Sequence, residues 1–133
     1  MSEFILNIST PERQFFNGPA EALRVCSTQG EIGVLPGHVS MVVALDAAPM
    51  HIKTGGEWKV AALSDGFARI TATQVTILAD AAEWPEEIEE NRALAAKKRA
   101  EERLQSRLSE VEYVRSRIAL QKALVRLTVK SGR

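Results

Sequence analysis

The pattern of the chain changes at Pro85. Before it, turn signals of glycine, proline, asparagine and aspartate recur about every 8–12 residues between short apolar segments, which is typical of an antiparallel β-sandwich or barrel. After it, from Glu86 to Ser131, the chain contains no glycine and no proline, and its apolar residues repeat at helical spacing. The sequence therefore predicts an antiparallel β-sandwich head, residues 1–84, followed by an antiparallel α-helical hairpin tail, residues 85–133.

The most distinctive stretch of the head is Gly30-Glu31-Ile32-Gly33-Val34-Leu35-Pro36-Gly37-His38. Pro36-Gly37 fits the two central positions of a type II turn, because glycine accepts the positive φ that the second of these positions requires. No Lys-Ser/Thr pair follows and no helical pattern begins, so a phosphate-binding loop is not indicated. We interpret the stretch as a tight corner between strands, with Glu31 and His38 available at its ends.

Other segments of the head predict strands and a turn. Residues 4–8 alternate in polarity as a half-buried strand does, whereas residues 41–45 are apolar without alternation, which predicts a strand buried on both sides. Asn17-Gly18 is expected to form a turn. Cys26 is the only cysteine, so no internal disulfide can form, and its apolar surroundings indicate a small core residue rather than a nucleophile.

Two glycine-containing pairs predict hairpins. Gly55-Gly56 separates residues 51–53 from residues 58–63, and Asp65-Gly66 leads from the second of these segments into residues 67–73. Gly-Gly and Asp-Gly are favoured in two-residue hairpin turns because such turns need positive φ. Both pairs are therefore expected to connect neighbouring antiparallel strands.

The sequence of the tail predicts two helices, with the break between them near residues 106–109. Pro85 suits the first turn of a helix, the acidic residues that follow it complement the helix N-terminus, and basic residues gather toward the far end. Ser109 followed by Glu112 fits a capping box that opens the second helix. The expected buried stripes are Ala93, Ala96, Ala100, Leu104 and Leu108 in the first helix, and Val111, Val114, Ile118, Ala119, Ala123, Val125 and Leu127 in the second.

This hairpin is predicted to open easily. A stripe of alanines buries little apolar area, so the closed hairpin gains little from packing. No glycine or proline prevents the two helices from forming one continuous helix. A partner that binds the open tail more tightly than the closed hairpin would therefore shift the equilibrium toward the open tail. A permanently packed hairpin is the alternative.

Charge divides between head and tail. The chain has 17 basic and 17 acidic residues, but residues 1–85 hold five Lys/Arg against nine Asp/Glu, a difference of −4, and residues 86–133 hold twelve against eight, a difference of +4. A basic tail indicates acidic surfaces or anionic ligands as partners. Nucleic acid is not expected, because glutamates interleave with the basic residues and Tyr113 is the tail's only aromatic residue. No apolar run approaches the length of a membrane span.

The residues predict no catalytic site and no metal site. Two histidines, one cysteine and scattered carboxylates form no convergent ligand set. His38 follows a corner glycine and His51 lies in a strand pattern, and neither has a nucleophile or carboxylate partner at an informative spacing. We therefore interpret the chain as a non-enzyme, and a small β-barrel enzyme that uses His38 is disfavoured.

Three blocks of the sequence resemble the epsilon subunit of bacterial F-type ATP synthases. They are Gly30–His38, Ser64–Ile70 and Val75–Asp80, and their order and spacing extend the resemblance over nearly the whole chain. The resemblance implies a rotor subunit whose head docks on the gamma subunit and rests against the ring of c subunits, with Glu31 facing the c-ring loops and His38 near gamma. Membrane contact, at the cytoplasmic face of the bacterial cell membrane, would come only through these partners.

The same resemblance implies that the tail is regulatory. Folded on the head it would leave rotation free, and extended along gamma it would reach the alpha and beta subunits and block rotation driven by ATP hydrolysis. The residues alone leave a rival open, a free-standing chaperone or adaptor with a β head and a coiled-coil arm. Copurification in fixed stoichiometry with alpha, beta and gamma chains, rather than with varied clients, distinguishes the two.

The stretch Ile88-Glu89-Glu90-Asn91-Arg92-Ala93 resembles the Ile/Leu-Asp-x-x-Arg-Ala motif with which several bacterial epsilon subunits bind ATP on the closed hairpin. Phosphates would draw Arg92 and Arg99 of the first helix toward Lys122 and Arg126 of the second. Two departures weaken the expected site: Glu89 replaces the aspartate of the motif, and Lys122 stands where strong binders carry arginine. The candidate residues are Ile88, Glu89, Arg92, Ala93, Arg99, Lys122 and Arg126. We expect no cofactor beyond a weakly bound regulatory ATP, and a solvated charged face is the alternative.

Overall fold

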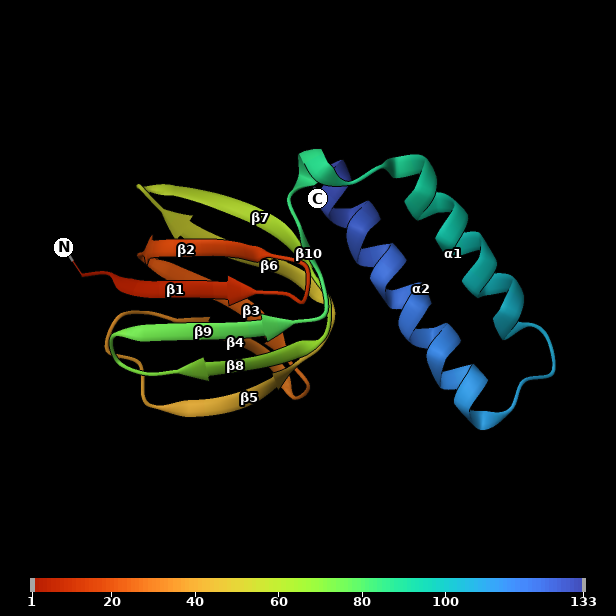
Figure 1. Ribbon diagram of the computed structural model, residues 1–133, viewed down its shortest axis with the longest axis horizontal. Coiled ribbons are helices and arrows are strands. Elements are labelled where there is room, and N and C mark those ends of the chain that lie inside the picture. Colours follow the sequence, from red (N-terminus) through yellow and green to blue (C-terminus); the bar gives the residue numbers. More distant parts are fainter. Residues whose placement is uncertain (1, 133) are drawn as a thin grey trace.

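Ten strands build the head and two helices build the tail in the computed structural model, which describes residues 2–132 (Figure 1). The strands are β1 (Phe4–Ser9), β2 (Gln14–Ala20), β3 (Ala22–Ser27), β4 (Gly30–Val34), β5 (Met41–Leu45), β6 (Ala48–Thr54), β7 (Glu57–Leu63), β8 (Gly66–Ile70), β9 (Gln74–Ala79) and β10 (Ala82–Glu83). The tail holds a short 3₁₀ helix, η1 (Pro85–Glu87), and the helices α1 (Glu90–Leu104) and α2 (Glu110–Ser131). This order confirms the predicted fold class.

The strands form two layers around one core. One layer runs β2-β1-β9-β8-β5 and the other β10-β7-β6-β3-β4, and the residue pair Ser27–Leu45 joins them. Neighbouring strands are antiparallel except β1 and β9, which run parallel. The sequence predicted an antiparallel sandwich, and this one parallel pair departs from it. The largest side chains buried between the layers include Phe4, Leu6, Ile8, Leu23, Met50, Ile52, Ile70 and Ile77.

The first reversal of the chain lies before the predicted one. Asn17-Gly18 belongs to β2, where Gly18 pairs with Leu6, so the predicted turn there is wrong. The chain reverses instead at Thr10–Arg13, where the N–H of Thr10 donates to the Arg13 carbonyl at 2.9 Å and the Thr10 hydroxyl accepts from the Arg13 N–H at 3.3 Å. A threonine acceptor followed by proline stabilises this turn, which outweighs the Asn-Gly signal in a strand at the edge of the sheet.

Two predicted turns are confirmed. At Pro36-Gly37 the glycine has a φ of 85°, and the His38 N–H donates to the Leu35 carbonyl at 3.1 Å. At Gly55-Gly56 both glycines have positive φ and connect β6 to β7. Residues 30–34 form the strand β4, paired with β3, so the corner is confined to the residues that follow them.

The predicted hairpin turn at Asp65-Gly66 is wrong. β7 ends at Leu63 and pairs with β6 and β10, whereas β8 begins at Gly66 and pairs with β5 and β9 in the other layer. The chain crosses between layers here. The glycine serves close packing, because a Cβ at Gly66 would lie 2.1 Å from the Leu78 carbonyl oxygen.

The exposure of side chains shows that two further predictions for the head are wrong. β5 is not buried on both sides, because Val42 is 69% exposed while Leu45 is 2% exposed. Each strand of a two-layer sandwich buries only one face, whatever its composition. Cys26 is half-buried rather than a core residue, and this partial burial raises the pKa of its thiol.

The first helix of the tail begins at Glu90 and not at Pro85. Pro85–Glu87 forms one 3₁₀ turn, and Ile88 and Glu89 are extended, with φ of −82° and −92°. The Ile88 side chain is 3% exposed in an apolar cluster beneath α2, and reaching that cluster interrupts the helical path. Most of the acidic residues expected to cap α1 therefore precede it, and Glu90 alone stands in its first turn.

The second helix begins as predicted, but it buries only part of the predicted stripe, Ala123 and Val125. The Ser109 hydroxyl accepts from the Glu112 N–H at 3.2 Å in a full capping box. Val111, Val114 and Ile118 are exposed, whereas the buried residues of α2 are Ser116, Ala123, Val125 and Val129. The reason is that α2 meets the head along β6 and β7 only near its C-terminal end, and its other half projects beyond the head beside α1 (Figure 1).

Candidate functional site at the head–tail junction

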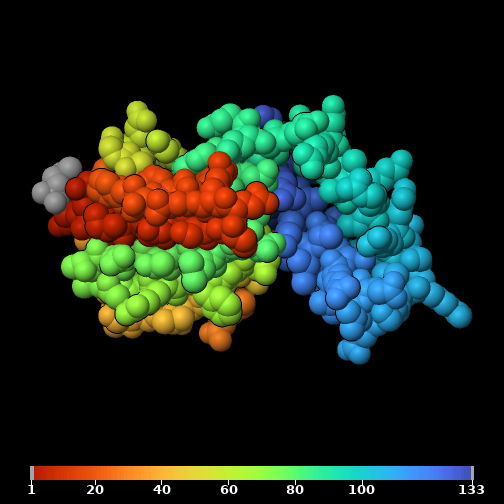
Figure 2. All heavy atoms as spheres, in the orientation of Figure 1, coloured from red at the N-terminus to blue at the C-terminus, as the bar shows by residue number. Residues whose placement is uncertain are grey.

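α2 rests on the head through a small apolar cluster. Its members are Ala47 and Ala62 of the head, Ile88 before α1, and Val125 and Val129 of α2. Figure 2 shows the tail against one end of the head, with α2 nearer the head than α1. Because two of these side chains are alanines, the contact removes little apolar area from water and stabilises the closed tail only modestly.

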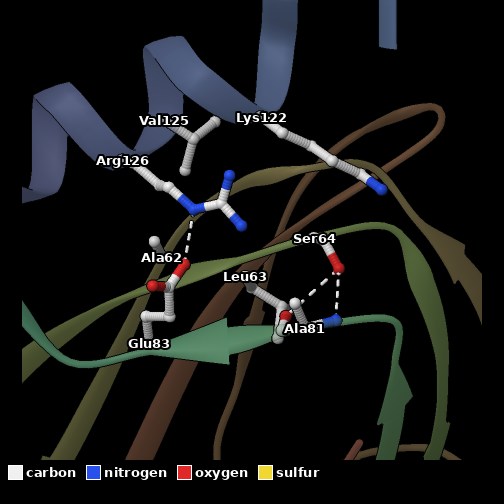
Figure 3. A pocket seen from close by; sticks show the side chains of 8 residues that line it. All are labelled: Ala62, Leu63, Ser64, Ala81, Glu83, Lys122, Val125 and Arg126. Carbon is white, nitrogen blue, oxygen red and sulfur yellow. Dashed lines mark hydrogen bonds and ion pairs between the residues drawn. The ribbon is translucent and has the colours of Figure 1, made fainter. Parts of the chain in front are cut away.

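Basic residues of α2 meet acidic residues of the head beside this cluster. Lys122 Nζ lies 3.1 Å from an Asp80 oxygen and 3.4 Å from an Asp65 oxygen. Arg126 Nε donates to the Glu83 carboxylate. Figure 3 shows Arg126 directed onto Glu83 and Lys122 directed away from it. Partly exposed pairs of this kind contribute about 0.2–1 kcal/mol each, so several weak bonds hold the tail.

A groove of about 390 Å³ opens next to this contact. It is lined by Glu83, Glu87, Glu89, Arg92, Ala93, Ala95, Ala96, Arg99 and Arg126. Within residues 2–132, Arg92 and Arg99 form no ion pair, and both are exposed. Guanidinium groups with free donors suit phosphate or carboxylate oxygens, so the groove can accept a small anion on its arginine side.

The structure brings together most, but not all, of the residues proposed for ATP. Those lining the groove are Glu89, Arg92, Ala93, Arg99 and Arg126. Ile88 lies in the apolar cluster behind it. Lys122 does not line the groove, because Asp65 and Asp80 hold its ammonium group on the other side of Arg126.

Two glutamates of the groove were not indicated by the sequence. Glu83 pairs with Arg126, 43 residues away, and Glu87 pairs with Arg13, 74 residues away. The hydrogen bond from Arg13 holds the pKa of the Glu87 carboxyl below its usual value. The only sequence signal was the acidic run before α1, which fitted equally well with helix capping.

Glu31 and His38 lie on the exposed part of the head. Glu31, on β4, accepts a hydrogen bond from Arg24 Nη2 at 2.9 Å, and both side chains are about half exposed. His38 Nδ1 lies 2.7 Å from the Val39 carbonyl oxygen. Among residues 2–132, no three His, Cys, Asp or Glu side chains gather as metal ligands. Neither helix described there combines the length and apolarity needed to cross a membrane.

The outer face of the β2-β1-β9-β8-β5 layer carries large exposed apolar side chains. Val42, Phe67 and Leu78 are 69%, 61% and 59% exposed, and Ile5 is 47% exposed. Phe67 and Leu78 are opposite each other across β8 and β9, and Arg69 pairs with Val42 across β8 and β5. We call Ile5, Val42, Phe67 and Leu78 the outer β face. Apolar side chains grouped on one face are typical of a contact surface.

Comparison with known proteins places both parts of the chain in one family. Residues 3–85 match the ATP synthase Delta/Epsilon chain beta-sandwich domain, and residues 86–131 match the long alpha-helix domain of the same chain. An ATP synthase epsilon chain of Ruminiclostridium cellulolyticum is 48% identical over 133 residues, which cover 100% of this chain and 99% of the relative. That of Bacillus licheniformis is 40% identical over 129 residues, covering 97% and 98%.

Similar chains occur in solved structures of ATP synthases, including the two that follow. One is the cryo-EM structure of the Euglena gracilis mitochondrial ATP synthase, OSCP/F1/c-ring in rotational state 1, with a TM-score of 0.79, 27% identity and coverage of 91% of this chain and 77% of that chain. The other is the Tetrahymena thermophila mitochondrial ATP synthase central stalk/c-ring, with a TM-score of 0.66, 13% identity and coverage of 98% and 96%. The second likeness concerns the fold alone.

Proposed function

The chain belongs to the ATP synthase delta/epsilon chain family, and from this premise we propose that it turns with the central stalk of a bacterial F-type ATP synthase as its epsilon subunit. It is a non-catalytic subunit. Its head couples the gamma subunit to the c-ring, and its tail inhibits ATP hydrolysis when it leaves the head. The observation that carries the proposal is a tail held on the head by a small apolar cluster and partly exposed ion pairs.

We assign the gamma subunit to the outer β face. Full burial of one large apolar side chain contributes about 1.5–3 kcal/mol, so covering Val42, Phe67 and Leu78 gives a lasting contact. A sheet face is also rigid, which suits a contact that transmits rotation. His38 stands in the turn just before β5, the strand that carries Val42, and is therefore placed near gamma.

The c-ring is assigned to the side of the head that carries Glu31. This residue lies on β4, which among residues 2–132 is paired only with β3, and its carboxylate is half exposed beside Arg24. A charged, accessible strand suits polar loops of a partner better than lipid. The chain thus meets the cytoplasmic face of the membrane through the c-ring.

The tail inhibits rotation when it is extended and does not inhibit it in the closed state. Lys122 and Arg126 are then occupied by the acidic residues Asp65, Asp80 and Glu83 of the head. When the tail extends along gamma, the same basic residues become available to acidic segments of the alpha and beta subunits. The closed state and the inhibitory state therefore use the same two basic residues, Lys122 and Arg126, and exclude each other.

The groove beside α1 binds ATP weakly and favours the closed tail. Arg92, Arg99 and Arg126 converge there from both helices, so opening the tail separates them and loses the ligand. Affinity is low because Glu83 already occupies Arg126 and because Lys122 is absent from the groove. Glu89 faces the same space and can accept a hydrogen bond from the ligand.

Reconstitution of the catalytic sector tests this function. Alpha, beta and gamma subunits are combined with the full chain or with a chain ending at Ile88, and ATP hydrolysis and coelution with gamma are measured. Both chains should coelute with gamma, and the full chain should lower hydrolysis several-fold more than the shortened one. Lys98→Ala, which changes an exposed tail cation outside the head contact, should inhibit like the parent chain.

The two halves of the proposal fail separately. If neither chain coelutes with gamma although circular dichroism shows a folded head, the assignment to the stalk is wrong. If both coelute but hydrolysis is the same with either, the subunit assignment stands and the inhibitory role of the tail is wrong.

A further inference from the structure

The segment that follows β10 is attached to the head by contacts that do not involve α2, although Lys130 of α2 also donates to the Pro85 carbonyl at 3.1 Å. The Trp84 ring stacks on Phe15 of β2 with centroids 4.4 Å apart and planes inclined by 25°. Trp84 also packs against the core of the head. Stacked aromatic pairs contribute about 0.5–1.5 kcal/mol beyond their buried area, so this contact persists without help from the tail.

Arg13 extends this attachment to η1. Its two terminal nitrogens each lie 2.7 Å from one oxygen of Glu87, a bidentate arrangement, and Nη2 also donates to the Ala82 carbonyl at 3.1 Å. The Glu87 carboxylate accepts a further hydrogen bond from the Trp84 N–H at 2.8 Å. The Arg13 guanidinium lies 5.1 Å from the centroid of the Phe15 ring. Arg13, Phe15, Trp84 and Glu87 thus form one unit, which we call the junction clamp.

From Ile88 onwards the chain packs against α2 rather than against the residues of the clamp. Ile88 packs with Val125 and Val129 of α2, and it is extended, as is Glu89. The first hydrogen bond of α1 runs from the Ala93 N–H to the Glu89 carbonyl. The Ile88 N–H closes the 3₁₀ turn by donating to the Pro85 carbonyl at 3.2 Å. Ile88 and Glu89 are therefore the two extended residues between the clamp and α1, where the 3₁₀ turn has ended and the α-helix has not yet begun.

We propose that the junction clamp stays on the head when the tail is released, and that the tail pivots at Ile88-Glu89 rather than at Pro85. The clamp is held by a bidentate pair and an aromatic stack. α2 is held by a small apolar cluster, by monodentate ion pairs of Lys122 and Arg126, and by hydrogen bonds from Gln121 to the Ala47 carbonyl and from Lys130 to the Pro85 carbonyl. Arg13, far away in sequence, is thereby a positioning residue for the pivot. The biological use of the pivot rests on the proposed release of the tail, but the clamp is testable on the isolated chain.

The test uses Trp84 fluorescence in the full chain with Trp58→Phe, which leaves Trp84 as the only tryptophan. Val125→Asp with Val129→Asp places two charges in the apolar cluster and releases α2, which is read as at least tenfold faster amide exchange in α2. Acrylamide quenching of Trp84 should stay unchanged on this release. If the charged variant precipitates, Val125→Ala with Val129→Ala replaces it, and the same two results are expected: faster amide exchange in α2 and unchanged quenching of Trp84.

Arg13→Gln in the released background should then increase Trp84 quenching at least twofold. Arg24→Gln is the matched control, because Arg24 makes a comparable exposed pair with Glu31 elsewhere on the head, and it should change nothing. Quenching that rises to the level of the unfolded chain on release of α2 alone would overturn the proposal, since the segment would then leave with the tail. Unchanged quenching in Arg13→Gln would overturn the role of Arg13. Neither result depends on assembly into an ATP synthase.

Discussion

Gly66→Ala should strongly destabilise the head. Gly66 begins β8 and pairs with Leu45 of β5 on one side and with Ala79 of β9 on the other. A Cβ at this position would lie 2.1 Å from the Leu78 carbonyl oxygen and 2.7 Å from the Ala79 Cα. Ordinary contacts of a Cβ begin near 3.4 Å, so β8 and β9 would have to separate by about 1 Å at a point where both are central strands.

The cost follows from that separation. Forcing extra atoms into a packed core costs about 1–3 kcal/mol, and each ladder hydrogen bond that lengthens or breaks costs about 0.5–1.5 kcal/mol. Together these terms give a loss of about 2–4 kcal/mol in the free energy of unfolding. For a domain of this size each kcal/mol lowers Tm by about 4–8 °C, so the expected decrease is roughly 10–30 °C.

Thermal unfolding followed by circular dichroism measures this decrease, with Gly33→Ala as the matched control. Gly33 is also a strand glycine, but a Cβ there meets no atom within 4 Å, and its φ is not in the left-handed region. Its Tm should change by less than about 4 °C, because surface substitutions stay near ±0.5 kcal/mol. Equal Tm values for the two variants would refute the steric argument.

Three further predictions concern charged residues. Because Arg13 holds the pKa of Glu87 below its ordinary value of 4.5, Arg13→Gln should be less stable than the parent above that pH, and the difference should vanish as the pH falls through the lowered pKa, measured by urea unfolding. In calorimetric titrations, Arg92→Ala should abolish ATP binding, whereas Lys122→Arg should leave it unchanged because Lys122 lies outside the groove. Glu31→Lys should weaken proton pumping per ATP hydrolysed without lowering Tm, since Glu31 is exposed.

Features whose cause lies within a few residues were predictable from the sequence. Pro36-Gly37 and Gly55-Gly56 supply the positive φ that their turns require, and Ser109 with Glu112 completes its capping box locally. In each case the backbone demand and the residue that meets it are neighbours in the chain. The strand-rich head and helical tail follow from the same local chemistry, which is why the fold class was correct.

Errors arose where one residue type serves two purposes. Asp65-Gly66 has the composition of a hairpin turn, but Gly66 is required by the backbone of β9, more than ten residues later in the chain. Asn17-Gly18 likewise resembles a turn and lies in a strand. Sequence shows that glycine is present, and only tertiary structure shows whether dihedral freedom or missing volume is what matters.

The candidate site shows the same limit for charge. The resemblance put Lys122 and Arg126 together at one anion site, and the charge split of −4 and +4 suggested acidic surfaces or anionic ligands as partners of the tail. Lys122 is instead neutralised by Asp65 and Asp80, and Arg126 by Glu83, so the tail's first acidic partner is its own head. On the proposed function, an acidic segment of another subunit would have to displace these carboxylates, and its apparent affinity would be reduced by the fraction of tails that are closed. If the groove binds an anion as proposed, that ligand would favour the closed tail and lower the affinity of the acidic segment further, so ligand and partner would act against each other through the same internal ion pairs.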